Sequence, residues 1–164
     1  MNISARIILA VIFGALIFAA LAAPLLLSGS FQTAAFFTYL PFSFFCHQIP
    51  ERSFMLTYHP LAVCHRCSGI YLGLFIGTLI SSFLFRIPPR IQRKCMICTA
   101  SLLALDALLP FTGFWSGIWF SRFLTGLVFG IVAAPFAVAG LDEILKTLSS
   151  YAPFRCFSKE FLHE

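Results

Sequence analysis

Residues 7–27 read IILAVIFGALIFAALAAPLLL and contain no charged side chain. At about 1.5 Å per residue, a helix of this length crosses the ~30 Å hydrocarbon core of a bilayer. The preceding Arg6 and the small residues of Ala20-Leu21-Ala22 are also typical of a cleavable signal peptide. Because the apolar run continues through residues 25–27, we favour a retained transmembrane helix.

The composition of the whole chain also indicates a membrane protein. Of its 164 residues, 60% are hydrophobic and 10% are charged, whereas a soluble domain is about half apolar and about one quarter charged. A soluble domain of this length must also cover its surface, so it has no core large enough for 21 phenylalanines. These values exclude a soluble enzyme, a disordered chain and a nucleic-acid binder.

Three further apolar runs predict that the chain crosses the membrane several times. They cover about residues 68–85, 96–109 and 123–141. The uncharged segment 31–45 is shorter, and its length suits an interfacial or re-entrant helix better than a full span. We therefore predict an all-α, polytopic membrane protein with about four transmembrane helices plus a short re-entrant or interfacial helix.

The basic residues set the expected orientation. The net charge is +5, and four cations fall in the short stretch 86–94 between two apolar runs. A clustered basic loop follows the positive-inside rule, whereas nucleic-acid binding needs a broad basic face. With this loop in the cytoplasm, eight of the eleven Lys and Arg residues lie inside, and both termini are cytoplasmic.

This topology divides the chain into four parts. Residues 1–27 form the first transmembrane helix, and residues 28–67 form an extracytoplasmic, Phe-rich segment with Cys and His motifs. Residues 68–141 form a three-helix membrane bundle, and residues 142–164 form a cytoplasmic tail.

Small residues recur at helical spacing on two of the predicted spans. They are Gly69, Gly73 and Gly77 on the second span, and Gly126, Gly130 and Ala134 on the fourth. Such stripes let helix backbones approach closely in lipid. We interpret them as packing faces within the bundle, although they could equally mediate a homo-oligomer or docking into a larger membrane complex.

The cysteine pattern points to chemistry on the outer face. Cys46 precedes His47, and the pair Cys64-x2-Cys67 lies at the start of the second span. A thiol at a helix start lies near unpaired backbone N–H groups and the positive end of the helix dipole. These favour the thiolate, which is both a metal ligand and a nucleophile.

Three interpretations of these cysteines stay open. The first is a metal site for zinc or iron, with Cys46, Cys64, Cys67 and His47 as ligands. Because the side chains of consecutive residues point in different directions, Cys46 and His47 are poorly placed to bind the same ion. One of them, such as His47, could instead orient a ligand, and His59 or His65 would then be the fourth ligand. The second is a thiol–disulfide redox protein that uses Cys64 and Cys67, with a quinone as a candidate partner. The third is an accessory subunit of a larger membrane complex with structural thiols.

An intramembrane carboxylate completes the candidate site. Asp106 lies about one turn from the outer end of the third predicted span, and Arg122 opens the fourth. Because a carboxylate in lipid is costly, we expect Asp106 to pair with Arg122, and a proton relay is the alternative.

The remaining cysteines are assigned no role at this site. Cys95 and Cys98 fall at the inner end of the third span, and we interpret them as reduced thiols. Cys156 has no partner that the sequence identifies, and we interpret His163 as a solvated residue of the tail.

These motifs resemble the signature of a family of small prokaryotic membrane proteins catalogued as domain of unknown function 2085. The similarity runs through residues 46–48, 52–54 and 64–73, with a less specific part at Asp106 and residues 122–126. It covers roughly residues 40–130, and Ala107 stands where the family sometimes has Asn or Gly. The resemblance implies a fold, a prokaryotic cytoplasmic (inner) membrane location and a set of residues, but no reaction.

The resemblance adds Gln48, Arg52, Ser53 and Tyr71 to the candidate site residues. It implies that Gln48 and Tyr71 donate hydrogen bonds to thiolates or to a histidine ring. Arg52 would bind an anion, a quinone head group or a lipid phosphate. For Tyr71, an interfacial anchor in the lipid bilayer is an equally good interpretation.

Overall fold

The computed structural model describes residues 3–29, 31–112 and 118–151. In chain order its elements are α1 (Ile3–Ser28), α2 (Gln32–Ser43), the 3-10 turn η1 (Pro50–Arg52), β1 (Ser53–Leu56), β2 (His59–Cys64), α3 (His65–Leu79), α4 (Ser81–Leu84), α5 (Pro89–Leu108), the 3-10 turn η2 (Leu109–Thr112) and α6 (Trp119–Tyr151). The described chain is mostly helical, as predicted, and one small hairpin is the exception to the all-α prediction.

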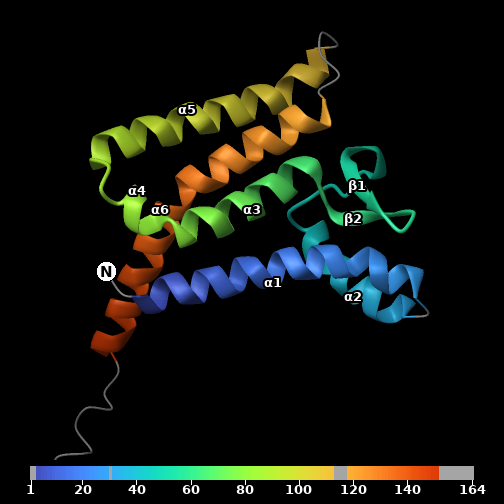
Figure 1. Cartoon of the computed structure of the whole chain (residues 1–164), viewed down its shortest axis with the longest axis horizontal. Helices are drawn as coiled ribbons and strands as arrows, with labels where there is room; N and C mark the ends of the chain where they lie inside the picture. Colours follow the sequence, from blue (N-terminus) through green and yellow to red (C-terminus); the bar gives the residue numbers. More distant parts are fainter. Residues whose placement is uncertain (1–2, 30, 113–117, 152–164) are drawn as a thin grey trace, which may run out of the picture.

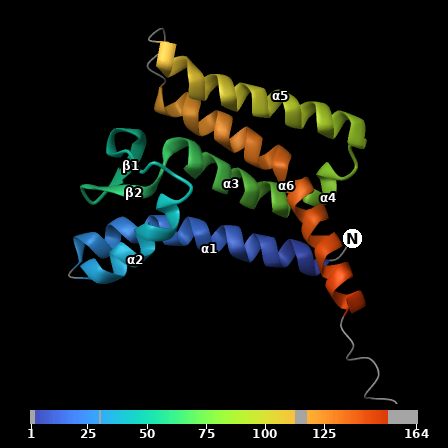
Figure 2. The ribbon, with the colours of Figure 1, turned by 180° about the vertical axis from the view of Figure 1, so that it is seen from behind.

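The long helices lie side by side in the order α5, α6, α3 and α1 (Figures 1 and 2). Only Ile80, with a ψ of 5°, separates α3 from the short helix α4, and together the two helices cover residues 65–84. One end of the molecule carries the start of α1, the α4–α5 connection and the end of α6. The hairpin, the end of α1 and the start of α6 lie at the other end, which we call the hairpin end (Figure 1).

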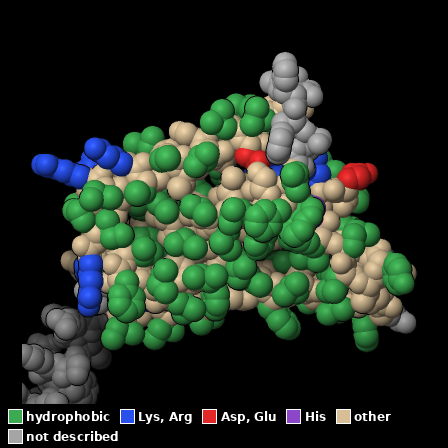
Figure 3. All heavy atoms as spheres, turned by 45° about the horizontal axis from the view of Figure 1, so that its top comes forward, with side chains coloured by type: hydrophobic (Ala, Val, Ile, Leu, Met, Phe, Trp, Pro, Cys, Tyr) green, Lys and Arg blue, Asp and Glu red, His purple; other side chains and the backbone are tan. Residues whose placement is uncertain are grey.

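Two of the described helices are long and apolar enough to cross a membrane. They are Ile3–Ser28 and Trp119–Ser150, with mean hydropathies of 2.7 and 2.1. Only 17% and 28% of their most apolar stretches are buried, so neither has the surroundings of a core helix in a soluble protein. Hydrophobic side chains cover the middle of the face shown in Figure 3, Lys and Arg lie at one end, and both basic and acidic side chains lie at the other.

Glycines bring the backbones of α3 and α6 into contact. A Cβ atom added to Gly73 would lie 2.2 Å from the carbonyl oxygen of Leu127, and one added to Gly130 would lie 2.4 Å from that of Ile70. Gly69, Gly77 and Gly126 are similarly close to the opposite helix. The two stripes therefore pack on each other within one chain, as the bundle interpretation predicts, and an association between chains would use another surface.

Helix boundaries differ from the sequence prediction at both ends of the bundle. α6 continues beyond residue 141 to Tyr151, into residues predicted as tail. Arg90, Arg93 and Lys94 were predicted in a loop but lie in the first turns of α5. Pro89 explains this start, because its fixed φ suits the first helical position and its missing N–H has no helical partner to lose.

The hairpin was not predicted from the sequence. β1 and β2 are antiparallel, and they pair Ser53 with Cys64 and Leu56 with His59. The turn places Thr57 and Tyr58 at φ values of 48° and 65°, and a type I′ hairpin turn needs this left-handed conformation at both central residues. Asn and Gly usually mark such a turn, so its sequence signal is absent here. The hairpin nevertheless sets the position of Cys64, which is the last residue of β2.

Candidate metal centre

Three separate segments bring cysteines together at the hairpin end of the molecule. Cys46 follows α2, Cys64 ends β2, and Cys67 lies in the first turn of α3. Their three sulfur atoms all lie within 4.8 Å of one another, and all three thiols are free. The sequence prediction that these cysteines share one site is thus matched by the geometry.

The segment after α2 is held in place by Gln48. Its backbone is left-handed, with φ at 49°. Its side-chain amide donates hydrogen bonds to the carbonyl oxygens of Tyr39 at 2.9 Å and Ala62 at 3.0 Å. Gln48 therefore ties the Cys46 segment to α2 and β2. These bonds go to the backbone and not to a thiol, unlike the role that the family resemblance implies.

An apolar shell surrounds the sulfurs. Cys46 is 5% exposed and belongs to a buried cluster with Ala20, Ala23, Phe42, Ala62 and Val63. Cys64, Cys67 and Tyr71 pack against this cluster, and Tyr71 is close enough to interact electrostatically with all three thiols. Electrostatic interactions are stronger in such surroundings than in water, and a buried thiolate is costly unless a positive group compensates its charge.

Local hydrogen bonds favour the thiolate form of Cys64. Hydrogen bonds from the thiols of Cys46 and Cys67 hold the pKa of Cys64 far below its ordinary value. The backbone N–H groups at the start of α3 add to this effect, while burial opposes it. The backbone N–H of Cys64 in turn donates to the sulfur of Cys46 at 3.2 Å.

This triangle of sulfurs fits a thiolate-bound metal ion. Zn–S bonds of about 2.3 Å in a tetrahedral site place two sulfurs about 3.8 Å apart. The observed upper limit of 4.8 Å is close to that separation. Small side-chain rotations would therefore bring all three sulfurs onto one ion and leave a fourth coordination position for another ligand.

The histidines considered as a fourth ligand lie outside this sulfur group. His47 is exposed, and the group that the described residues form contains cysteines only. His59 is half-buried on β2. The ring of His65 packs edge-on against Phe54, with ring centroids 4.4 Å apart. The side chains of Cys46 and Cys64 thus turn towards the site without bringing their histidine neighbours into it.

Asp106 has a partner that the sequence analysis missed. Its Oδ2 accepts hydrogen bonds from Nη2 of Arg66 at 2.6 Å and from Nε at 3.2 Å. The Oγ of Ser121 donates to the other carboxylate oxygen at 3.1 Å. Asp106 also attracts Arg122, the expected partner, electrostatically. Arg66 lies three residues before Gly69 on the stripe that faces α6, and this spacing could have identified it.

The other residues implied by the resemblance have separate positions. Arg52 is exposed in η1 and interacts electrostatically with Arg122. Ser53 is buried, and its Oγ donates to the carbonyl oxygen of Ile49 at 3.0 Å. Cys95 and Cys98 are exposed free thiols on α5 and are not in the sulfur group. Cys156 and His163 lie outside the described residues.

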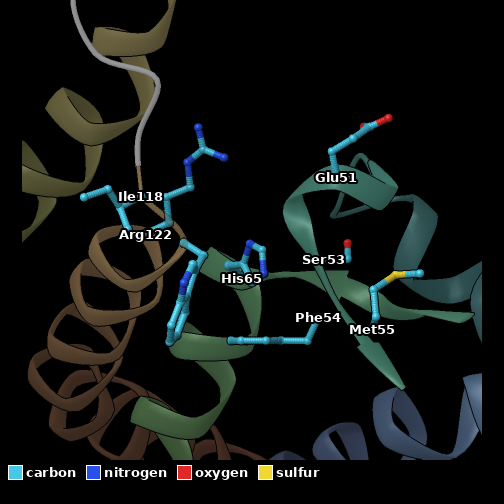
Figure 4. Close-up of a pocket in the computed structure, with 8 residues that line it drawn as sticks. Glu51, Ser53, Phe54, Met55, His65, Ile118 and Arg122 are labelled. Atoms are coloured by element: carbon cyan, nitrogen blue, oxygen red, sulfur yellow. The ribbon is translucent and has the colours of Figure 1, made fainter. Parts of the chain in front are cut away.

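A cavity of about 690 Å³ adjoins the start of α3 (Figure 4). It is lined by Glu51, Ser53, Phe54, Met55, His65, Ile118, Trp119 and Arg122. Of these residues, the sequence analysis treated only Ser53, His65 and Arg122 as candidates. The aromatic wall was missed because the hairpin that carries Phe54 was not predicted.

The comparisons with known proteins identify the family of the chain. A family model described as a predicted membrane protein, DUF2085, matches residues 46–156, from the first cysteine of the site onward. The chain belongs to this family. The resemblance inferred from the sequence is therefore confirmed, together with the classification as a membrane protein.

Two archaeal relatives of this DUF2085 protein are uncharacterized. A protein of Methanocaldococcus jannaschii is 35% identical over 94 residues, which are 56% of this chain and 60% of that protein. The match thus spans less than two thirds of that relative. A protein of Methanothermobacter thermautotrophicus is 34% identical over 110 residues, which are 65% of this chain and 92% of that protein. No solved structure matches the chain.

Proposed function

We propose that this DUF2085 protein is a metal-binding membrane protein that holds zinc or iron on Cys46, Cys64 and Cys67. The observation that carries the proposal is the triangle of three free sulfurs within 4.8 Å, built from three separate segments. Soft thiolate ligands select zinc or iron over magnesium and calcium. The ion would also compensate the negative charge of thiolates in their apolar shell.

The proposed membrane arrangement has four spans, with the cysteine site on the outer face. α5 has 20 residues and is about 30 Å long, and α3 and α4 together cover residues 65–84, so each of these segments has the length of a hydrocarbon core. α3 lies beside α1 and α6, and α5 lies beside α6 (Figure 1). The start of α1, the basic start of α5 and the end of α6 share one end, which supports a cytoplasmic location for that end.

The metal would have three protein ligands and one open position. We propose that water or a substrate occupies this fourth position, or His47 after a side-chain rotation, because His47 is exposed and its side chain is not packed against another ring of the described residues, as that of His65 is. Three protein ligands with an open position are typical of catalytic zinc, whereas structural zinc sites are closed by four.

Thiol–disulfide exchange is the second candidate function. Its supporting observation is the lowered pKa of Cys64, because a thiolate at the start of a helix is the attacking species in such reactions. Cys67 lies one turn further along α3 and would resolve the resulting mixed disulfide.

Elemental analysis combined with thiol counting on the same purified chain separates these candidates. We expect about one zinc or iron per chain, lost in Cys64→Ser and retained in Cys95→Ser. The second variant removes an exposed thiol near the start of α5, at the end of the bundle opposite the hairpin. All six thiols should be countable after denaturation with a chelator. A metal-free chain with two thiols fewer would contradict the metal proposal and favour the redox function.

A further inference from the structure

The cavity beside the start of α3 combines a buried positive charge with an unsatisfied hydrogen-bonding atom. Arg122 is 7% exposed and His65 is 8% exposed. The Nδ1 atom of His65 is buried and has no hydrogen-bond partner among the described residues. Buried polar atoms almost always have a partner, and an Nδ1–H group at this position would donate a hydrogen bond to a ligand oxygen.

The charges around the cavity favour an anion. Arg122 interacts electrostatically with two further arginines, Arg52 and Arg66, and Asp106 is the nearby carboxylate that attracts Arg122 while it hydrogen-bonds Arg66, so the positive charges outnumber the negative ones among the described residues here. Glu51 is exposed and lies across the cavity from Arg122 (Figure 4). Guanidinium groups bind phosphate oxygens through strong, charge-assisted hydrogen bonds.

A second cavity shares one lining residue, Phe54, with the first. It has a volume of about 280 Å³ and lies between α1, the hairpin, α3 and α6, with Leu21, Leu72 and Phe123 in its almost wholly apolar lining. Phe54 lines both cavities, and the centroid of its ring lies 5.9 Å from the ring centroids of Trp119 and of Phe123. Leu72 is seven residues beyond His65 on α3, which is about 10 Å deeper along the helix.

The depth of the two cavities matches the two parts of a lipid. Trp119 is the first residue of α6 and is 54% exposed, and tryptophan is enriched at the level of lipid head groups. The polar cavity therefore lies at the height of lipid phosphates, and the apolar cavity lies at the height of their chains.

We propose that Arg122 and His65 bind the phosphate of an anionic lipid whose hydrocarbon chain occupies the apolar cavity beneath Phe54. This inference rests on the membrane arrangement proposed above but not on the metal. The phosphate accepts charge-assisted hydrogen bonds from Arg122 and a further hydrogen bond from the Nδ1–H group of His65. The lipid would then lie beside the cysteine site, separated from it by the first turn of α3.

Quenching of Trp119 fluorescence tests the proposal on the full-length chain as purified, with Trp115→Phe leaving one tryptophan. The probe is phosphatidic acid with bromines near the head group, in neutral detergent, and diacylglycerol with the same brominated chains is its control. We expect saturable quenching by phosphatidic acid and at least about tenfold weaker quenching by diacylglycerol. Equal quenching by both lipids would overturn the proposal.

Variants assign the binding to this site. Arg122→Gln should weaken phosphatidic acid binding about tenfold, while Arg122→Lys should weaken it less and Arg86→Gln, at the far end of the bundle, should not change it. His65→Phe keeps the ring contact with Phe54 and should also weaken binding. If Arg122→Gln does not fold, as judged by circular dichroism and thermal unfolding, His65→Phe decides. Unchanged binding in the folded variants would overturn the proposal.

Two further arms identify the source of the phosphate. Leu21→Phe fills the apolar cavity and should weaken phosphatidic acid binding, because the larger side chain then occupies the volume needed by the hydrocarbon chain of the lipid. Inorganic phosphate should compete only at concentrations far above that of the lipid. Competition at equal concentration would show a site for free phosphate and overturn the lipid assignment. Metal content, measured on each sample, keeps a failure of the metal proposal separate from a failure of this one.

Discussion

The Asp106 carboxylate joins three helices through its two oxygens. It accepts hydrogen bonds from Arg66 on α3 and Ser121 on α6, while its own backbone belongs to α5. Its side chain is 8% exposed and that of Arg66 is 24% exposed. Removing one partner of such a pair leaves the other charge poorly compensated, which costs more than the pair itself contributes.

We expect Asp106→Asn to lower the free energy of unfolding by about 2–3 kcal/mol, because Arg66 would keep a partly buried charge without its counter-ion. Arg90→Gln is the control. It removes an exposed cation at the start of α5 that forms no ion pair among the described residues, and should change the free energy of unfolding by under about 0.5 kcal/mol. The measurement is the apparent melting temperature in detergent, and equal melting temperatures for both variants would contradict this account of Asp106.

At the residue scale, the sequence predicted the cysteines but not their neighbours. A Cys-x2-Cys pair at a helix start places both thiols on the same turn, so their proximity could be predicted from spacing. Cys46 was added to the site because the predicted topology places it on the same side of the membrane. His47 was named because it is adjacent to Cys46, yet consecutive side chains diverge, and the structure leaves it exposed. Arg66 was missed because its contact with Asp106 depends on how α3, α5 and α6 pack.

The contact between α3 and α6 depends on backbone proximity at glycine. A Cβ atom at Gly73 would meet the Leu127 carbonyl oxygen at 2.2 Å, and this backbone atom cannot move without separating the helices. A Cβ atom at Gly140, lower on α6, would have no atom within 4 Å. The two glycines therefore have different roles on neighbouring helices.

Gly73→Ala should destabilise the protein by about 3 kcal/mol through overpacking, which lowers the apparent melting temperature by about 6–12 °C. Gly140→Ala, in contrast, should leave it unchanged or raise it slightly, because alanine favours a helix by up to about 1 kcal/mol. Thermal unfolding followed by circular dichroism distinguishes them. A Gly73→Ala variant as stable as Gly140→Ala would show that α3 and α6 do not pack as described.

At the element scale, helices were predictable and the hairpin was not. Apolar runs and glycine spacing identified the helices that form the bundle, because lipid and close packing act directly on composition. The hairpin depends on left-handed Thr57 and Tyr58, which carry no turn signal in the sequence. Its register follows from tertiary packing of the buried segment 61–63 against the rest of the molecule.

The proposed topology places the two ends of the whole molecule on opposite sides of the membrane. Tyr58, at the tip of the hairpin, is 97% exposed, and Cys95 is an exposed thiol near the start of α5. Figure 1 shows these two elements at opposite ends of the bundle. They therefore offer one reporter position for each side.

In intact cells, a membrane-impermeant maleimide should add a label to Tyr58→Cys beyond the wild-type level. Cys95 should react only after lysis, as judged by the label that Cys95→Ser loses. The reason is that the bilayer separates the outer hairpin from the cytoplasmic start of α5. Labelling of Cys95 in intact cells would contradict the orientation.

X-ray absorption spectroscopy at the metal edge of the purified full chain tests the central claim most directly. It measures which atoms surround the ion, and so tests the sulfur triangle itself. We predict three sulfur neighbours at about 2.3 Å for zinc, with one lighter nitrogen or oxygen neighbour at about 2.0 Å. In Cys64→Ser the sulfur number should fall or the metal should be lost. A shell of nitrogen and oxygen alone, or a chain without metal, would contradict the account.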